Sequence, residues 1–278
     1  MARHLPDSST ENHAWQGAPE SGELVFLGTG TSVGVPSVGC ACDVCTSSDV
    51  KNYRTRCALA VGLPEGTLLI DTPPDLRSQL VREQIGIVHA VLYTHEHADH
   101  LFGLDDLRIM QFHLGHPVPI YCEERVEDRI RRSFDYAFSN RDHTHPGAVP
   151  QLVFHRITAQ PFELLGTRIV PVRLLHGPRF RVLGFRVGNV AYCTDTNDIP
   201  AESLELLQDL DILILDALRH RPHPTHFSLE EAMDIAERLQ AGHTYFTHIC
   251  HELDHATTNE QLPANMELAY DGLRLSWS

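Results

Sequence analysis

The sequence lacks the features that indicate nucleic-acid binding, export or membrane insertion. Its 22 Lys and Arg are outnumbered by 37 Asp and Glu, for a formal net charge of −15. Because grip on a phosphate backbone relies on clustered Lys and Arg, nucleic acid is not an expected partner. The N-terminal stretch has no apolar signal-peptide core, and no segment approaches the length of a membrane span. We therefore expect a cytoplasmic protein with no membrane partner.

The sequence also lacks repeats and low-complexity tracts, and its seven cysteines are an odd number. Three of them fall within one short stretch, CACDVC at 40–45. Clustering this tight in a chain of 278 residues favours metal binding over a disulfide framework. Cys40, Cys42 and Cys45 would supply three thiolates, and a closed structural zinc site needs a fourth ligand.

Hydrophobic residues make up 42% of the chain, enough for a sizeable core. Residues 1–22 are polar, and we expect a disordered tail there, followed by one domain at 23–278. The long stretch 135–151 has no regular pattern, as is common in segments that contact substrate.

Short apolar runs bounded by turn residues predict many strands. Their ranges are 24–28, 57–62, 67–71, 88–94, 152–156, 168–174, 181–187, 189–194, 211–216, 243–248 and a final strand within 268–276. Helices are predicted at 75–85, 103–113, 123–134, 200–208 and 228–240. Ser228 and Glu231 form a capping box at the start of the last helix, and Gly242 supplies its stop. An antiparallel pair around Gly188-Asn189 favours two packed sheets with helices outside over a doubly wound parallel sheet.

The stretch THEHADH follows the apolar strand at 88–94 and carries His95, His97, Asp99 and His100. Imidazole nitrogens and carboxylate oxygens suit zinc and similar divalent ions. Two neighbouring ions need more ligands than these four residues supply.

Three later residues stand at the ends of other apolar runs. His176 follows RIVPVRLL, Asp195 follows NVAYCT, and His248 follows HTYFT. Each alone has an ordinary explanation as a loop histidine, a turn aspartate or a strand end. Their repeated placement predicts that they complete a two-metal site.

This set of residues resembles the ligand set of the metallo-β-lactamase-fold hydrolases. Within that superfamily, LGTGTSVGVPSVGCACDVC at 27–45 and HADHLFGLDDLR at 97–108 are similar to the phosphodiesterase branch. That branch includes the cyclic phosphodiesterases that accompany carbon–phosphorus lyase (PhnP-like) and, more distantly, transfer RNA 3′-processing enzymes. The resemblance covers roughly residues 24–278. It implies an α/β fold, the four-layer αβ/βα sandwich of the metallo-β-lactamase fold.

The resemblance also implies a role for each matching residue. His95, His97 and His176 would hold one metal ion, Asp99, His100 and His248 the other, and Asp195 would bridge the two. Zinc and manganese both fit these ligands. Asp71, at the end of TLLID, matches a carboxylate behind the metal ligands that would orient a histidine. Its alternative is an ordinary strand-end aspartate.

A further histidine points to phosphodiester chemistry. His226 matches an accessory histidine of the phosphodiesterase branch, although His223 in the same HPTH stretch is a rival. A metal-bridging hydroxide would attack phosphorus, and a nearby imidazole would act as acid or electrostatic clamp. His226, with Asp99, is therefore expected to be catalytic. The alternative for His226 is that it only caps or packs against the helix at 228–240.

The fourth ligand of the cysteine cluster is His251 by resemblance, which implies a separate structural zinc that ties this loop to the chain near the active site. By spacing alone Cys250 is an alternative. Asp105, Asp106 and Arg108 match the branch too, but they would also serve as a helix start with a salt bridge. Their role stays open.

The function expected is a two-metal-ion phosphodiesterase that hydrolyses a small phosphorylated substrate, with a ribosyl cyclic phosphate as the favoured type. Three alternatives use the same scaffold: a transfer RNA 3′-processing endonuclease, an ester, lactone or thioester hydrolase, and a non-catalytic zinc-binding protein. A homodimer is a default expectation only.

Overall fold

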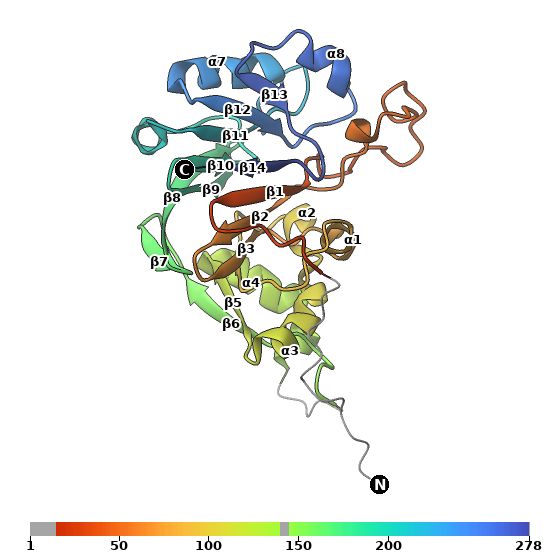
Figure 1. Ribbon diagram of the computed structural model, residues 1–278. Helices are drawn as coiled ribbons and strands as arrows, with labels where there is room; N and C mark the ends of the chain where they lie inside the picture. The colour runs from red at the N-terminus through yellow and green to blue at the C-terminus, as the bar shows by residue number, and fades with distance from the viewer. Residues whose placement is uncertain (1–14, 140–144, 278) are drawn as a thin grey trace.

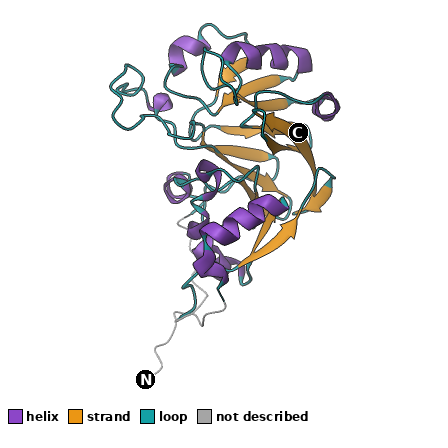
Figure 2. Cartoon of the chain, turned by 180° about the vertical axis from the view of Figure 1, so that it is seen from behind, coloured by secondary structure: helices purple, strands orange, loops and turns teal. Residues whose placement is uncertain are grey.

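Two β-sheets lie face to face in the centre of the molecule, and helices cover the outer side of each (Figure 1). The computed structural model describes residues 15–139 and 145–277. The same layers are visible from behind, with the strands enclosed between helices (Figure 2). This arrangement is the expected αβ/βα sandwich.

The first sheet has the spatial order β14-β1-β2-β3-β4-β5-β6. Its bounds are β1 Glu23–Gly28, β2 Ala58–Leu63, β3 Gly66–Ile70, β4 Ala90–Leu92, β5 Val118–Cys122, β6 Leu152–Arg156 and β14 Arg274–Ser276. Strands β14 to β3 pair antiparallel, whereas β3 to β6 pair parallel.

The second sheet has the order β13-β12-β11-β10-β9-β8-β7. Its bounds are β7 Phe162–Leu164, β8 Thr167–His176, β9 Phe180–Val187, β10 Val190–Cys193, β11 Ile212–Asp216, β12 His243–Thr247 and β13 Met266–Leu268. Strands β7 to β10 are antiparallel and β10 to β13 parallel. The β9–β10 pair turns at Gly188-Asn189 as predicted.

Helices fill the two outer layers. On the first sheet's side these are α1 Leu76–Arg82, α2 Ala98–Leu101, η2 Leu104–Ile109, α3 Met110–Leu114, α4 Glu124–Ser133 and α5 Asp135–Phe138. The others are η1 Val50–Asn52, α6 Ala201–Leu204, η3 Glu205–Leu207, α7 Leu229–Leu239 and α8 His255–Asn259. None of the helices in the described ranges is long and apolar enough to cross a membrane.

The core consists of three apolar clusters, one between the sheets and one between each sheet and its helices. Strand β9 contributes side chains to two of these clusters. Val182 joins the cluster on the α7 side, whereas Leu183 and Phe185 join the cluster between the sheets. This alternation follows from the two-residue period of a strand. The strand ends are thereby fixed at the sheet edges, where the polar residues lie.

Every predicted strand and helix is present, with differences at particular residues. Strand β5 was not predicted, because Pro119 argues against an interior strand, and the three-residue β7 was also missed. The final strand is in fact two, β13 and β14. The capping box of Ser228 and Glu231 is confirmed, but α7 ends with Gln240 in the left-handed conformation (φ 52°) rather than at Gly242.

The predicted tail lies partly outside the described residues, which begin at Trp15. Residues 15–22 are not detached from the domain. The Gly17 N–H donates to the Gln84 carbonyl at 2.9 Å, and the Gly22 N–H donates to the Gly62 carbonyl at 3.2 Å. Of the irregular stretch predicted at 135–151, the first residues form α5, and 140–144 lie outside the described residues. The domain boundary at residue 23 stays a prediction.

Candidate metal centre

Seven of the predicted ligands come together where four strands end. His95 and His97 follow β4, and Asp99 and His100 lie in the first turn of α2. His176 is the last residue of β8, Asp195 comes two residues after β10, and His248 comes directly after β12. Strands of both sheets thus deliver ligands to one place.

The seven side chains form two groups that share Asp195. One group is His95, His97, His176 and Asp195, and the other is Asp99, His100, His248 and Asp195. Within each group the ligand atoms all lie within 4.8 Å of one another. The two Asp195 oxygens lie between the groups: Oδ1 is 3.1 Å from His100 Nε2, and Oδ2 is 3.8 Å from His95 Nε2.

The donor atoms fit divalent cations. His95 Nε2 and His97 Nδ1 approach to 2.9 Å. Among the described residues, His100 Nε2 and both nitrogens of His248 are buried without a hydrogen-bond partner. Buried polar atoms normally have partners. Imidazole nitrogens and carboxylates that converge in this way, with unsatisfied lone pairs, have the chemistry of a site for zinc or a similar ion.

The electrostatics of the cluster agree with this interpretation. Burial lowers the pKa of His95 well below its usual value, so this imidazole is neutral, as a metal ligand must be. Burial on its own would lower the pKa of His248 as well, but the carboxylates of Asp195 and Asp99 raise it to about 9. Burial would raise the pKa of Asp195, but His100 and His248 hold it well below its usual value. The carboxylate charges therefore require a cation or protons nearby.

Asp71 orients two of the histidines from behind. His100 Nδ1–H donates to Asp71 Oδ2 at 2.7 Å, and the Thr94 hydroxyl donates to the same oxygen at 2.8 Å. His95 Nδ1–H in turn donates to Thr94 Oγ1 at 2.9 Å. These bonds fix the tautomers so that the Nε2 lone pairs of His95 and His100 are available to the site. Asp71 therefore occupies the place that the resemblance implied.

Three residues of the site have strained backbone. Asp71, Asp195 and His248 have φ values of 64°, 54° and 59°. Non-glycine residues in this left-handed region cost about 1 kcal/mol or more and persist only where the surroundings impose them. At these strand ends the strain turns each side chain into the cluster.

His226 pairs with Asp216 beside the cluster, and with His248 the two form a third group whose possible ligand atoms lie within 4.8 Å of one another. Its Nδ1–H donates to Asp216 Oδ2 at 2.6 Å, and the same oxygen accepts the Thr196 N–H at 3.0 Å. The His226 ring stacks on His248 with centroids 4.4 Å apart and an interplanar angle of 12°. Because Asp216 occupies Nδ1, Nε2 is the His226 nitrogen that remains available as a donor or acceptor.

Asp216 was not predicted as a functional residue. A signal was present, since it ends the apolar run DILILD just as other ligands end theirs. His223, the predicted rival of His226, is half-exposed and accepts a hydrogen bond from Thr225 Oγ1 at 3.2 Å. It contacts His226 with ring centroids 5.2 Å apart but belongs to none of the possible metal groups in the described chain.

The predicted zinc ligands also come together. The Sγ atoms of Cys40, Cys42 and Cys45 are 3.3, 3.3 and 3.6 Å from His251 Nδ1. A hydrogen bond from the backbone of Cys45, aided by His251, lowers the pKa of Cys42 to about 6. Three thiols and one imidazole nitrogen at one point fit a closed tetrahedral zinc site.

Cys250, the alternative by spacing, is outside this group and accepts the Glu252 N–H through its Sγ at 3.4 Å. The buried Arg54 follows the cysteine loop in the chain and connects it to the segment around His251. Its guanidinium donates to the carbonyls of Cys250 (2.9 Å) and Leu253 (2.7 Å). In Figure 1 the loop that carries the cysteines extends from the body beside α8.

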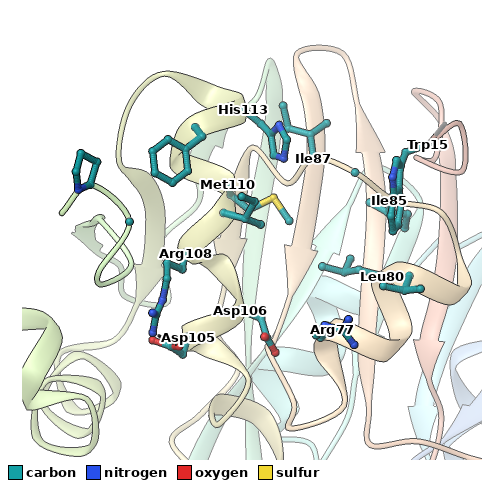
Figure 3. Close-up of a pocket in the computed structure, with 16 residues that line it drawn as sticks. Trp15, Arg77, Leu80, Ile85, Ile87, Asp105, Asp106, Arg108, Met110 and His113 are labelled. Carbon is teal, nitrogen blue, oxygen red and sulfur yellow. Dashed lines mark hydrogen bonds and ion pairs between the residues drawn. The ribbon is translucent and has the colours of Figure 1, made fainter. Parts of the chain in front are cut away.

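Asp105, Asp106 and Arg108 belong to a different feature. They line a pocket of about 830 Å³ between α1, η2 and α3 (Figure 3). Its apolar wall includes Trp15, Leu80, Ile85, Ile87 and Met110. Asp105 pairs with Arg108 and accepts the Tyr136 hydroxyl. The pocket contains no residue of either metal group, so the salt-bridge alternative describes these residues.

Comparison with known proteins agrees with the geometry. Residues 67–249 match the model of the beta-lactamase superfamily domain. Together with the two sheets and the metal-ligand groups, this match places the chain in the beta-lactamase superfamily, as a metal-dependent hydrolase with the metallo-β-lactamase fold.

Within the superfamily the chain is PhnP-like. It is 46% identical to a diphosphatase from the PhnP family, with a TM-score of 0.86 and coverage of 92% of this chain and 98% of that one. The zinc-bound PqqB of Methylobacterium extorquens shares the fold, at 20% identity and a TM-score of 0.73, over 92% of this chain and 100% of that one.

A curated relative differs in length. An octanoyltransferase of Porphyromonas gingivalis is 38% identical over 253 residues, which are 90% of this chain and 50% of that protein. The chain therefore spans about half the length of this relative.

Replacing Asp71 with Asn should weaken metal binding to the two groups that share Asp195 about 10- to 100-fold. A neutral amide accepts the hydrogen bonds from His100 and Thr94 less strongly than the carboxylate does. Competition with a chromogenic chelator measures the affinity. Asp234→Asn, at an exposed position of α7, is the matched control. Equal affinities for the wild type and Asp71→Asn would contradict the orienting role.

Cys42→Ser should remove one tightly held zinc ion per chain and lower the melting temperature, because a three-ligand site no longer closes. Elemental analysis after mild chelation measures the zinc that remains. Cys250→Ser should keep that zinc, since Cys250 lies outside the cluster. If Cys250→Ser loses the ion and Cys42→Ser keeps it, the ligand set is wrong.

Proposed function

We propose that the chain is a two-metal-ion hydrolase of phosphodiester or phosphoanhydride bonds in a small phosphorylated substrate. The two metal ions would be held by the groups that share Asp195, and a structural zinc by Cys40, Cys42, Cys45 and His251. The observation that carries the proposal is the Asp216–His226 pair beside His248. The similarity to a PhnP-family diphosphatase supports it.

The metal ions, when bound, would neutralise phosphate oxygens and lower the pKa of a bound water. In the net hydrolysis a water oxygen joins phosphorus and the P–O bond to the leaving group breaks. The leaving oxygen needs a proton as its charge develops. His226 would give that proton from Nε2, while Asp216 would hold the ring through the Nδ1–H.

Two features of the site support this assignment over a purely structural role for His226. His226 is only 8% exposed, so its hydrogen bond to Asp216 is largely shielded from water. Asp216 is fully buried, and its Oδ1 has no hydrogen-bond partner in the described structure. A buried carboxylate that accepts the Nδ1–H of one imidazole holds that ring in one orientation and one tautomer.

The substrate class is tested with a panel assayed on the metal-loaded protein. Bis(p-nitrophenyl) phosphate, a ribose 1,2-cyclic phosphate and a diphosphate diester represent the proposed class. A lactone and an octanoyl thioester represent the acyl alternative, the latter chosen because of the octanoyltransferase relative. We expect turnover of phosphorus substrates above that of both acyl substrates. Thioester hydrolysis without phosphoryl hydrolysis would refute the proposal.

His226→Ala should lower kcat for phosphodiester hydrolysis about 100-fold or more, since a positioned acid contributes that much. Asp216→Asn should lower it too, by a smaller factor. Metal content, measured on the same samples, should stay at the wild-type level in both variants. His223→Ala is the matched control and should keep most of its activity on bis(p-nitrophenyl) phosphate. Loss of metal in His226→Ala would instead make His226 a ligand.

A further inference from the structure

The turn between β8 and β9 brings an aromatic ring to the metal centre. His176, the last residue of β8, pairs directly with Phe180, the first residue of β9. Residues directly opposite in an antiparallel pair have side chains on the same face of the sheet. The register therefore places Phe180 beside a predicted metal ligand.

The Phe180 ring contacts the cluster but is not enclosed by it. Its centroid lies 5.1 Å from that of His97, with an interplanar angle of 74°, and 6.1 Å from that of His176. The side chain nevertheless remains 38% exposed. Among the ring contacts of the described residues, it is the only non-histidine ring against these ligands. Phe180 thus offers an exposed aromatic surface beside two of the predicted ligands.

The turn that carries Phe180 is held rigidly. The Gly177 N–H donates to Asn197 Oδ1 at 2.6 Å, and Gly177 has a φ of 69°. A Cβ atom at this position would lie 2.6 Å from Thr225 Cγ2, so the turn packs closely on the segment that carries His223 and His226. His176 Nδ1–H also donates to the Thr225 carbonyl at 2.8 Å. The backbone at the start of this turn is therefore anchored to the segment that carries His223 and His226.

Arg179, in the same turn, is a free cation. It is exposed and has no hydrogen-bond or ion-pair partner among the described residues. Arg219 and Arg221, on the loop before His223, are by contrast both paired with Glu252. A chain with a net charge of −15 needs local positive charge to attract an anion. Arg179 carries such a charge one residue before Phe180 in the chain.

We propose that Phe180 and Arg179 select substrates that carry a planar aromatic ring and a second phosphate. Phe180 would stack on the ring, which is worth about 1–3 kcal/mol for a nucleobase on an aromatic side chain. Arg179 would bind the phosphate that is not attacked, through charge-assisted hydrogen bonds. The preferred class is then a nucleotide diphosphate diester. This assignment rests on the proposed hydrolase function and adds its selectivity.

Kinetics on two probes tests the selectivity. ADP-ribose has both a nucleobase and a diphosphate, whereas ribose 1,2-cyclic phosphate has neither. Phe180→Ala and Arg179→Ala should each lower kcat/KM for ADP-ribose about 10- to 100-fold and change that for the cyclic phosphate less than about threefold. Phe180→Leu, which keeps an apolar contact with His97, should not restore the ADP-ribose rate. Arg168→Ala, at an exposed position of β8, is the control for lost charge.

Binding gives a readout that does not depend on turnover. Calorimetry with the α,β-methylene analogue of ADP-ribose should show weaker binding to both variants at unchanged metal content. Equal losses on both kinetic probes would overturn the proposal and make Phe180 a packing residue for His97. Unchanged binding of the analogue would overturn it as well. Intact, Phe180-dependent binding without hydrolysis of either probe would instead contradict the hydrolase function alone.

Discussion

The carboxylate of Asp195 is the point on which the site depends. Its two oxygens face two sets of imidazoles, and in the set with His100 and His248 buried nitrogen atoms have no hydrogen-bond partner among the described residues. A cluster of this kind is costly without cations, because buried polar atoms lose their water. With cations bound, the same atoms would become ligands, and the Asp195 carboxylate would face both groups. The position of the Asp195 carboxylate between two sets of imidazoles is therefore the feature of the fold that would allow metal chemistry.

The sandwich satisfies this constraint by ending its strands at one place. Apolar residues fix β4, β8, β10 and β12 within the core clusters, and the first polar residues beyond them meet at the sheet edges. Left-handed backbone at Asp71, Asp195 and His248 turns these side chains inward. The cysteine loop is tied to the same region, since its fourth predicted ligand, His251, lies three residues after His248. The strand packing that folds the chain therefore also positions the predicted ligands.

The sequence allowed much of this to be predicted, and the reasons are local. THEHADH brings four predicted ligands together within six residues. His176, Asp195 and His248 each follow an apolar run whose own residues predict a strand. Asp216 follows such a run too, but its role depends on His226, ten residues later, and the contact arises only from packing. Strand β5 was missed because Pro119 opposes a strand locally, while pairing with β4 and β6 outweighs that preference. Phe180 carries no motif, and its importance follows only from its register with His176.

The most direct measurement is anomalous X-ray diffraction from crystals of the metal-loaded protein, recorded on both sides of the zinc edge. The account predicts three anomalous peaks per chain. One lies on each side of Asp195, and the third lies among Cys40, Cys42, Cys45 and His251. With manganese in the active site, the first two peaks would keep their positions in the map. Their signal would then change across the manganese edge instead of the zinc edge. A single ion at Asp195, or ions bound away from the seven ligands, would contradict the account.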